Sequence, residues 1–267
     1  MNFSRNILNK LLGDLSQNTD DPVNTLYYAL RLLSKWRSAM IQNTFIKEEG
    51  TKVLQGPLKG LDFIEKSAEG CHVPKLLGSY EQPLHPFIQK SSISDYKKVI
   101  NIGCAEGYYA VGFAMVAPSL VSYAFDTNGQ AREICAKLAQ KNGVGDRVKI
   151  GSEFGHADFA RYGHERVLVF CDIEGAEDEL LNPEKAPSLR KLDIIVESHE
   201  CLRSGVTQRL ISRFKATHDI RLVEDNGTRL LEAPPRWFAK LAHLDQLLAT
   251  WEWRSGPTPW LVMRAKN

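Results

Sequence analysis

The stretch Lys98-Val-Ile-Asn-Ile-Gly-Cys-Ala-Glu-Gly-Tyr-Tyr-Ala-Val-Gly112 decides the fold. It has the pattern of a buried strand that is broken by glycines and opens directly into a helix. Without a Cβ, each glycine lets the backbone approach a ligand closely. A second apolar strand over 120–125 ends on Asp126, whose carboxylate can accept hydrogen bonds from the hydroxyls of a ribose. The combination predicts a nucleoside-binding half-site.

The turn Gly103-Cys-Ala-Glu-Gly107 departs from the dinucleotide fingerprint Gly-x-Gly-x-x-Gly. Ala105 stands where the second glycine lets a pyrophosphate lie against bare backbone, so NAD is disfavoured. Glu106 supports the same conclusion, because an acid beside a pyrophosphate would be repelled. An adenosyl ligand without phosphates is compatible with both residues, and we therefore expect S-adenosylmethionine. A glycine turn in some other α/β domain is the alternative.

From Asp95 onward the chain alternates between strand and helix patterns. Such alternation predicts a parallel sheet with helices on both faces. Ligands in sheets of this kind bind at the carboxyl ends of the strands. The expected strands cover residues 99–102, 121–125, 148–150, 166–171, 192–196, 220–223 and 260–263, and the expected helices run to residue 117, over 130–140, over 206–216 and to about residue 250.

Polar side chains follow the fourth and fifth expected strands: Asp172 and Glu174 after one, Glu197 and His199 after the other. Side chains alternate along an extended chain, so each pair shares one direction, and the pairs converge if the two strands are neighbours. His199 is the expected general base, because its ordinary pKa lies near neutrality. Glu197 would orient His199 or hold the acceptor, and Asp172 would face the cofactor or the acceptor.

Other interpretations of this cluster stay open. Asp172, Glu197 and His199 would together bind a divalent metal that lowers the pKa of a hydroxyl acceptor. An oxygen-rich set of ligands favours magnesium or manganese. Alternatively, the acids cap the following helices or pair with surface cations. The acidic run over 174–179 is expected to be partly a solvated helix face, and His156 receives no role.

Composition excludes several classes of protein. The chain has 267 residues and a net charge of +2, which gives no case for nucleic-acid binding. No apolar run approaches the roughly 20 residues of a membrane span, and the amino terminus has no signal-peptide core. Five scattered cysteines are typical of reduced thiols. We expect a cytoplasmic protein with a small-molecule acceptor and no nucleic-acid or membrane partner; a homo-oligomer is left open.

An amino-terminal extension over 1–94 precedes the sheet domain over 95–267. Residues 1 to about 50 have a helical pattern, and Leu26-Tyr-Tyr-Ala-Leu-Arg-Leu-Leu-Ser-Lys-Trp-Arg37 repeats apolar residues at intervals of three and four. The favoured interpretation is an amphipathic helix packed on the main domain, and a lid or dimer arm is the alternative. Residues 51–95 look irregular. An insert over about 233–258 carries tryptophans that pack it or line a pocket.

The motifs resemble those of a known family. Asn101-Ile-Gly-Cys-Ala-Glu-Gly107 resembles the first motif of class I S-adenosylmethionine-dependent methyltransferases. Asp172-Ile-Glu-Gly-Ala-Glu177 resembles the hallmark of the FkbM type, and Glu197-Ser-His199 resembles its next strand end. The resemblance covers about 95–264. It implies a Rossmann-like α/β fold with a seven-stranded, mostly parallel sheet and an antiparallel last strand. Asn101 stands where the family commonly has an acid.

The resemblance also implies the place of the cofactor. The first motif would lie along it, Asp126 would hold its ribose, and Ser152 or Glu153 would sit near the adenine. Tyr80 and Glu81 precede the first strand, where methyltransferases often have a covering loop. The expected cofactor-binding residues are Asn101, Gly103, Ala105, Glu106, Gly107, Asp126, Thr127, Ser152, Glu153, Asp172, Tyr80 and Glu81.

The leading functional hypothesis is an S-adenosylmethionine-dependent O-methyltransferase. Its acceptor would be a hydroxyl of a small metabolite, a sugar or a natural-product intermediate, as the resemblance implies. An NAD-dependent oxidoreductase is one alternative. A catalytically silent cofactor-binding partner subunit is the other.

Overall fold

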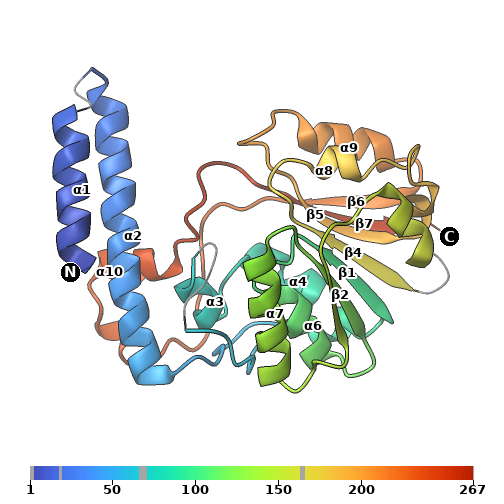
Figure 1. The fold of residues 1–267 in the computed structure, drawn as a ribbon, viewed down its shortest axis with the longest axis horizontal. Coiled ribbons are helices and arrows are strands. Elements are labelled where there is room, and N and C mark those ends of the chain that lie inside the picture. Colours follow the sequence, from blue (N-terminus) through green and yellow to red (C-terminus); the bar gives the residue numbers. More distant parts are fainter. Residues whose placement is uncertain (1–2, 18–19, 66–70, 163–165, 267) are drawn as a thin grey trace.

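The fold is built around one seven-stranded sheet (Figure 1), seen in a computed structural model that describes residues 3–17, 20–65, 71–162 and 166–266. The strand order is β3-β2-β1-β4-β5-β7-β6. Strands β1 to β5 pair in parallel, whereas β7 runs antiparallel to both of its neighbours. The strands are β1 (Lys98–Ile102), β2 (Val121–Phe125), β3 (Val148–Gly151), β4 (Val167–Cys171), β5 (Asp193–Glu197), β6 (His218–Val223) and β7 (Trp260–Ala265).

The sequence-based predictions of the sheet are confirmed. All seven strands lie where the apolar runs predict them, and the last strand is antiparallel. Every residue of β4 is buried, because helices cover both faces of the sheet at this strand. The chain therefore has the expected Rossmann-like α/β architecture.

Alternate residues of the strands enter two separate hydrophobic cores. Val99 and Phe170 belong to the core under α6 (Tyr108–Val116) and α7 (Gly129–Lys141). On the opposite face, Ile100 and Val169 pack in the second core. That face carries α8 (Glu177–Leu180), α9 (Val206–Phe214) and the 3-10 helices η2 (His156–Tyr162) and η3 (Pro187–Lys191), and Figure 1 shows α8 and α9 across the sheet from α6 and α7.

The amino-terminal extension begins with a helical hairpin of α1 (Phe3–Gln17) and α2 (Pro22–Glu49), which stands beside the sheet domain (Figure 1). The last part of α2 enters the first core through Ile41 and Phe45. The insert forms η4 (Phe238–Lys240) and α10 (His243–Thr250), and α10 packs on α2. Arg37 of α2 donates to Asp245 of α10 over 2.7 Å. Extension and insert are therefore joined to each other.

The prediction that 51–95 is irregular is wrong in part. The segment contains α3 (Val73–Leu77), η1 (Gln82–Leu84), α4 (His85–Ile88) and α5 (Lys90–Ile93). Pro74 and Pro86 stand in the first turns of α3 and α4, where a missing backbone N–H costs nothing, so prolines that suggested irregularity begin helices instead. In the described part of the chain, none of the helices combines the length and the apolar character that crossing a membrane requires.

Candidate functional site

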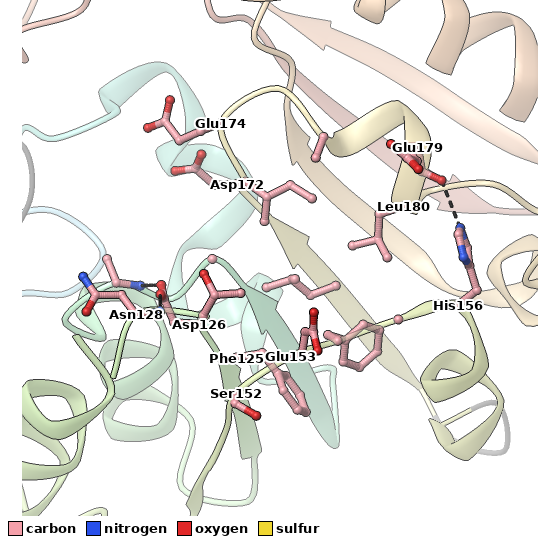
Figure 2. A pocket seen from close by; sticks show the side chains of 18 residues that line it. Phe125, Asp126, Asn128, Ser152, Glu153, His156, Asp172, Glu174, Glu179 and Leu180 are labelled. Carbon is pink, nitrogen blue, oxygen red and sulfur yellow. Dashed lines mark hydrogen bonds between the residues drawn. The ribbon is translucent and has the colours of Figure 1, made fainter. Parts of the chain in front are cut away.

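A cavity of about 640 Å³ lies above the carboxyl ends of β1, β2, β3 and β4. The loops that follow these strands form its walls (Figure 2). This is the edge at which open α/β sheets bind ligands. The predicted cofactor residues that line the cavity are Gly103, Ala105, Asp126, Thr127, Ser152, Glu153 and Asp172.

The turn after β1 depends on missing side-chain atoms. Gly103 has φ +77°, and a Cβ there would lie 1.6 Å from the carbonyl oxygen of Asp172. Gly107 has φ +91°, and its Cβ would lie 2.6 Å from Sγ of Cys135 in α7, so this glycine serves the packing of the turn on α7. Between them Ala105 adopts φ +44°, which is uncommon for a residue with a Cβ.

Asp126 holds this turn from the tip of β2. Its Oδ2 accepts the backbone N–H of Ala105 at 2.8 Å, and its Oδ1 accepts that of Asn128 at 2.8 Å. These bonds keep Ala105 in its left-handed conformation and place the carboxylate between the two ends of the cavity (Figure 2). Each carboxylate oxygen retains a second lone pair that a ligand hydroxyl can use.

One end of the cavity is formed by the segment after β3. Ser152, Glu153 and Phe154 lie here, and the ring of Phe154 packs edge-on against that of Phe125 at 4.8 Å between centroids. His156, which has no role in the sequence-based prediction, also lines this end, and its Nε2 lies 3.0 Å from the carbonyl oxygen of Glu179. This end of the cavity therefore offers hydrogen-bonding groups and aromatic edges, which suit a flat ring with polar edges.

At the other end, acidic side chains gather around His199. Strands β4 and β5 are neighbours, so the predicted convergence of their strand ends occurs. Nδ1 of His199 lies 2.7 Å from Oε1 of Glu177. Its Nε2 lies 3.3 Å from Glu174, 3.6 Å from Asp172 and 3.7 Å from Glu197. Asp172 and Glu174 line the cavity (Figure 2). His199 is buried and is not among the lining residues.

Burial and crowding shift the pKa values in this cluster. Burial, with the nearby carboxylates of Glu197 and Glu81, raises the pKa of Asp172 well above its usual range. Burial alone would lower the pKa of His199, but Glu177 and Glu197 outweigh it and the pKa is raised. Burial would raise the pKa of Glu177, but the hydrogen bond with His199 lowers it. The cluster therefore favours an added positive charge, either a proton or a cation.

Among the residues that the structure describes, two groups of side chains have the spacing of metal ligands, and they share Asp172. The group of Glu81, Asp172 and Glu197 already has a cation, because Arg254 from the insert bonds Glu197 and also Glu81, the latter over 3.1 Å. Even so, burial and Glu197 raise the pKa of Glu81 to about 8. For the group of Asp172, Glu174 and His199, no lysine or arginine of the described residues forms an ion pair with either acid.

Several predicted cofactor residues lie outside the cavity lining. Glu106 is completely buried, and its Oε1 lies 2.8 Å from Nζ of Lys75 in α3, so it faces a buried lysine rather than the cavity. Asn101 is buried in β1 and donates to the carbonyl of Phe170. The lining also does not include Gly107, Tyr80 or Glu81.

The expectation of a solvated face over 174–179 is wrong for Glu177 and Asp178, which are 0% and 5% exposed. Glu177 turns back to accept the backbone N–H of Gly175 at 3.0 Å as well as bonding His199. The glycine two positions earlier was the available signal, because an acid can cap such a turn. Arg254, 57 residues from Glu197 in sequence, has no local signal at all.

Comparisons with known proteins bear on the fold. No protein-family model and no curated protein matches the chain. A candidate O-methyltransferase from Klebsiella pneumoniae is 14% identical, with 88% of this chain and 100% of that one covered and a TM-score of 0.50. An O-methyltransferase from Bacillus cereus in complex with SAH is 13% identical, with 65% of this chain and 76% of that one covered and a TM-score of 0.45.

A third solved structure is the O-methyltransferase TomG from Streptomyces achromogenes, which is involved in tomaymycin synthesis and is in complex with SAM. It has 14% identity, coverage of 66% and 75%, and a TM-score of 0.45. The likeness to the Klebsiella structure supports the fold of this chain alone, a Rossmann-like α/β sheet domain preceded by amino-terminal helices.

Proposed function

We propose that the protein is an S-adenosylmethionine-dependent methyltransferase that methylates a hydroxyl of a small molecule. One observation carries the proposal: the glycine turn after β1 and the carboxylate of Asp126 meet in a cavity at the carboxyl edge of the sheet. In this assignment Asp126 and Thr127 hold the ribose, and Ser152 and Glu153 lie beside the adenine. The FkbM type remains part of the proposal, supported by the motif at Asp172.

The charge of the cavity supports this cofactor over NAD. The described residues that line it include the carboxylates of Asp126, Glu153, Asp172, Glu174 and Glu179, and no lysine or arginine. S-adenosylmethionine carries a cationic sulfonium and an ammonium group, which such a wall attracts, whereas the phosphates of NAD would be repelled. The cofactor supplies an activated methyl group, so the protein's tasks are alignment of the acceptor and removal of its proton.

Calorimetric titration tests the cofactor. We expect S-adenosylmethionine and S-adenosylhomocysteine to bind and NAD not to bind. Asp126→Ala should weaken the binding of S-adenosylhomocysteine by roughly 10- to 100-fold, which is the scale of a hydrogen bond to a charged group. Asp146→Ala, at an exposed position away from the cavity, is the matched control and should bind normally. Binding of NAD without either adenosyl ligand, or full affinity in Asp126→Ala, would contradict the proposal.

We further propose that Asp172, Glu174 and His199 hold a divalent cation, with Glu197 next to them. Three features support it. The ligand atoms of the trio lie within 4.8 Å of one another. The bond of Nδ1 to Glu177 directs Nε2 towards the carboxylates, as in many histidine–metal sites. Glu174 has a left-handed backbone, φ +54°, and such strain is concentrated at functional sites. The cation would lower the pKa of an acceptor hydroxyl.

A titration with Mn²⁺, followed by electron paramagnetic resonance, tests the cation without relying on turnover. We expect one bound ion per chain and weaker binding in Glu174→Gln. The side chain of Glu174 is largely exposed, so this substitution should leave the core intact. Glu184→Gln, at another exposed acid, is the control. Absence of Mn²⁺ binding together with full activity after exhaustive chelation would contradict the metal and leave Nε2 of His199 as the base that accepts the proton.

The remaining parts of the proposal concern the acceptor and the compartment. A panel of hydroxylated metabolites with labelled cofactor tests turnover, and a catalytically silent partner subunit would bind the cofactor tightly but label nothing. We place the protein in the cytoplasm, because all five cysteines are free thiols and such thiols persist in reducing compartments. Localisation of a tagged chain by fractionation tests this.

A further inference from the structure

The hairpin of α1 and α2 presents an apolar face that the sheet domain does not cover. Nε1 of Trp36 donates to Oγ of Ser4 at 3.1 Å, which pairs the start of α1 with the middle of α2. The two helices therefore run antiparallel, and Figure 1 shows them standing apart from the sheet domain. The sides that carry Ser4 and Trp36 are the sides on which the helices face each other.

Each helix carries a stripe of exposed aliphatic side chains. Those of α2 are between 41% and 77% exposed and are spaced by three, four and three residues. Those of α1 are between 38% and 58% exposed and are spaced by four and three. Such spacing keeps the side chains on one side of a helix and is typical of the buried seams of helical bundles. The stripes are Val23, Leu26, Leu30 and Leu33 on α2 and Leu8, Leu12 and Leu15 on α1.

The two stripes lie on the same face of the hairpin. At about 3.6 residues per turn, the α1 stripe is displaced from Ser4 in the same rotational sense as the α2 stripe from Trp36. Because the helices are antiparallel, displacement in the same sense leads to the same side. The α2 stripe ends where α10 begins to cover the helix: Arg37, the next position in the spacing, bonds Asp245.

We propose that this face is the interface with a second copy of the chain, and that two hairpins form a four-helix bundle about a two-fold axis. A hairpin with its inner sides paired and one outer face apolar is half of such a bundle. A fully exposed aromatic side chain presents roughly 150–250 Å² and a leucine less, so the seven stripe residues, each 38–77% exposed, present on the order of 500 Å². That is more than half of the ~800 Å² per partner of a standard interface, and patches of this size on monomers are often functional.

A self-complementary partner also agrees with the charges. Helix α1 carries Arg5, Lys10 and Asp14, and the α2 segment over 22–33 carries Arg31 alone. Arg31 is engaged with the backbone carbonyls of Trp253 and Arg254, so it holds the hairpin to the insert. Surface-binding membrane helices are instead rich in lysine and arginine along their polar side. The hairpin has few charges along this face, which suits an apolar partner surface such as the same face of a second hairpin.

Sedimentation equilibrium of the full chain tests the proposal. At about 10 µM, where a micromolar association is visible, we expect a mass of twice 30.1 kDa. Leu26→Glu/Leu30→Glu should sediment at 30.1 kDa, with association weakened at least about 100-fold by charges in an apolar seam. Leu222→Glu, at another exposed leucine on β6, is the matched control and should remain a dimer.

Circular dichroism and thermal unfolding show whether the double variant is folded. Because both substituted leucines are exposed, we expect the helix content and the melting temperature of the sheet domain to be unchanged. A wild-type chain that is monomeric at this concentration, or a double variant that stays dimeric, would overturn the proposal. Monomers that co-sediment with anionic phosphatidylserine vesicles through the same leucines would overturn it as well, because the face would then bind lipid.

Discussion

At the scale of single residues, the turn after β1 is set by which atoms are absent. The missing Cβ of Gly103 leaves the space through which the carbonyl of Asp172 passes. Asp126 holds the N–H of Ala105 and so maintains an uncommon backbone conformation at the edge of the cavity. The sequence predicted the glycine turn and the acid beside it, because glycines and an acid at fixed spacing reflect local geometry. It did not predict that the carbonyl of Asp172 lies against Gly103 or that Asp126 accepts the N–H of Ala105, since both contacts depend on the folded chain.

Replacement of Gly103 by alanine tests this geometry. Both Gly103 and Gly143 have left-handed backbones, φ +77° and +68°, but a Cβ at Gly143 meets nothing within 4 Å. Gly143→Ala should cost roughly 1–2 kcal/mol from backbone strain alone. Gly103→Ala should lose at least ~2 kcal/mol more, because the overlap with Asp172 must be relieved. Urea unfolding measures both, and equal losses would contradict the steric account.

Glu106 provides a second test at this scale. Its carboxylate is buried against Lys75, whose ammonium group lies 5.1 Å from the centroid of the Tyr80 ring. Glu106→Gln leaves that ammonium without its counter-charge and should cost about 3–5 kcal/mol of unfolding free energy. The double variant Lys75→Met/Glu106→Leu should recover most of the loss. A single variant within ~1 kcal/mol of wild type would show that the pair does not act as a buried ion pair.

At the scale of elements, the adjacency of β4 and β5 brings Asp172, Glu197 and His199 together. Alternation along a strand predicts which side chains share a direction, but not the order of the strands, so the convergence was a conditional prediction. Glu177 and Arg254 could not be placed in the same way. Glu177 reaches His199 through a tight turn, and Arg254 reaches Glu197 from the insert. Both contacts depend on the folded chain and have no local sequence pattern.

The buried histidine that precedes the short helix α3 predicts a pH dependence of stability. His72, directly before α3, is buried and stacked on Phe63 with 5.2 Å between ring centroids. Burial, with the nearby charge of Lys75, lowers its pKa to about 4. The unfolded state, with a histidine pKa near 6.5, therefore binds more protons between these values. Stability contributed by neutral His72 is present above that window and falls as the pH is lowered through it.

Comparison of wild type with His72→Phe isolates this contribution. Between pH 6.5 and 4, wild type should lose up to about 3 kcal/mol of unfolding free energy through His72. The phenylalanine variant keeps the ring but cannot bind a proton, so its loss over the same range should be smaller by that amount. Chemical unfolding at several pH values provides the measurement. Parallel curves for the two proteins would contradict a buried neutral histidine.

At the scale of the whole molecule, the sheet domain is far more predictable than its additions. Apolar runs separated by helical patterns specify seven strands, because burial on both faces requires them. The extension and the insert are distant in sequence yet bond through Arg31, Arg37 and Asp245. The apolar spacing of α2 indicates a helix, but it does not show which distant segment that helix contacts, so the bonds to α10 and to the end of the insert could not be inferred.

The crystal structure of the complex with S-adenosylhomocysteine tests the central claim most directly. We predict the adenine beside Ser152 and Glu153, the ribose hydroxyls on the carboxylate of Asp126, and the sulfur at the end of the cavity that Asp172 lines. A ligand bound elsewhere, or a cavity that stays filled by the protein's own side chains at saturating ligand, would contradict the account.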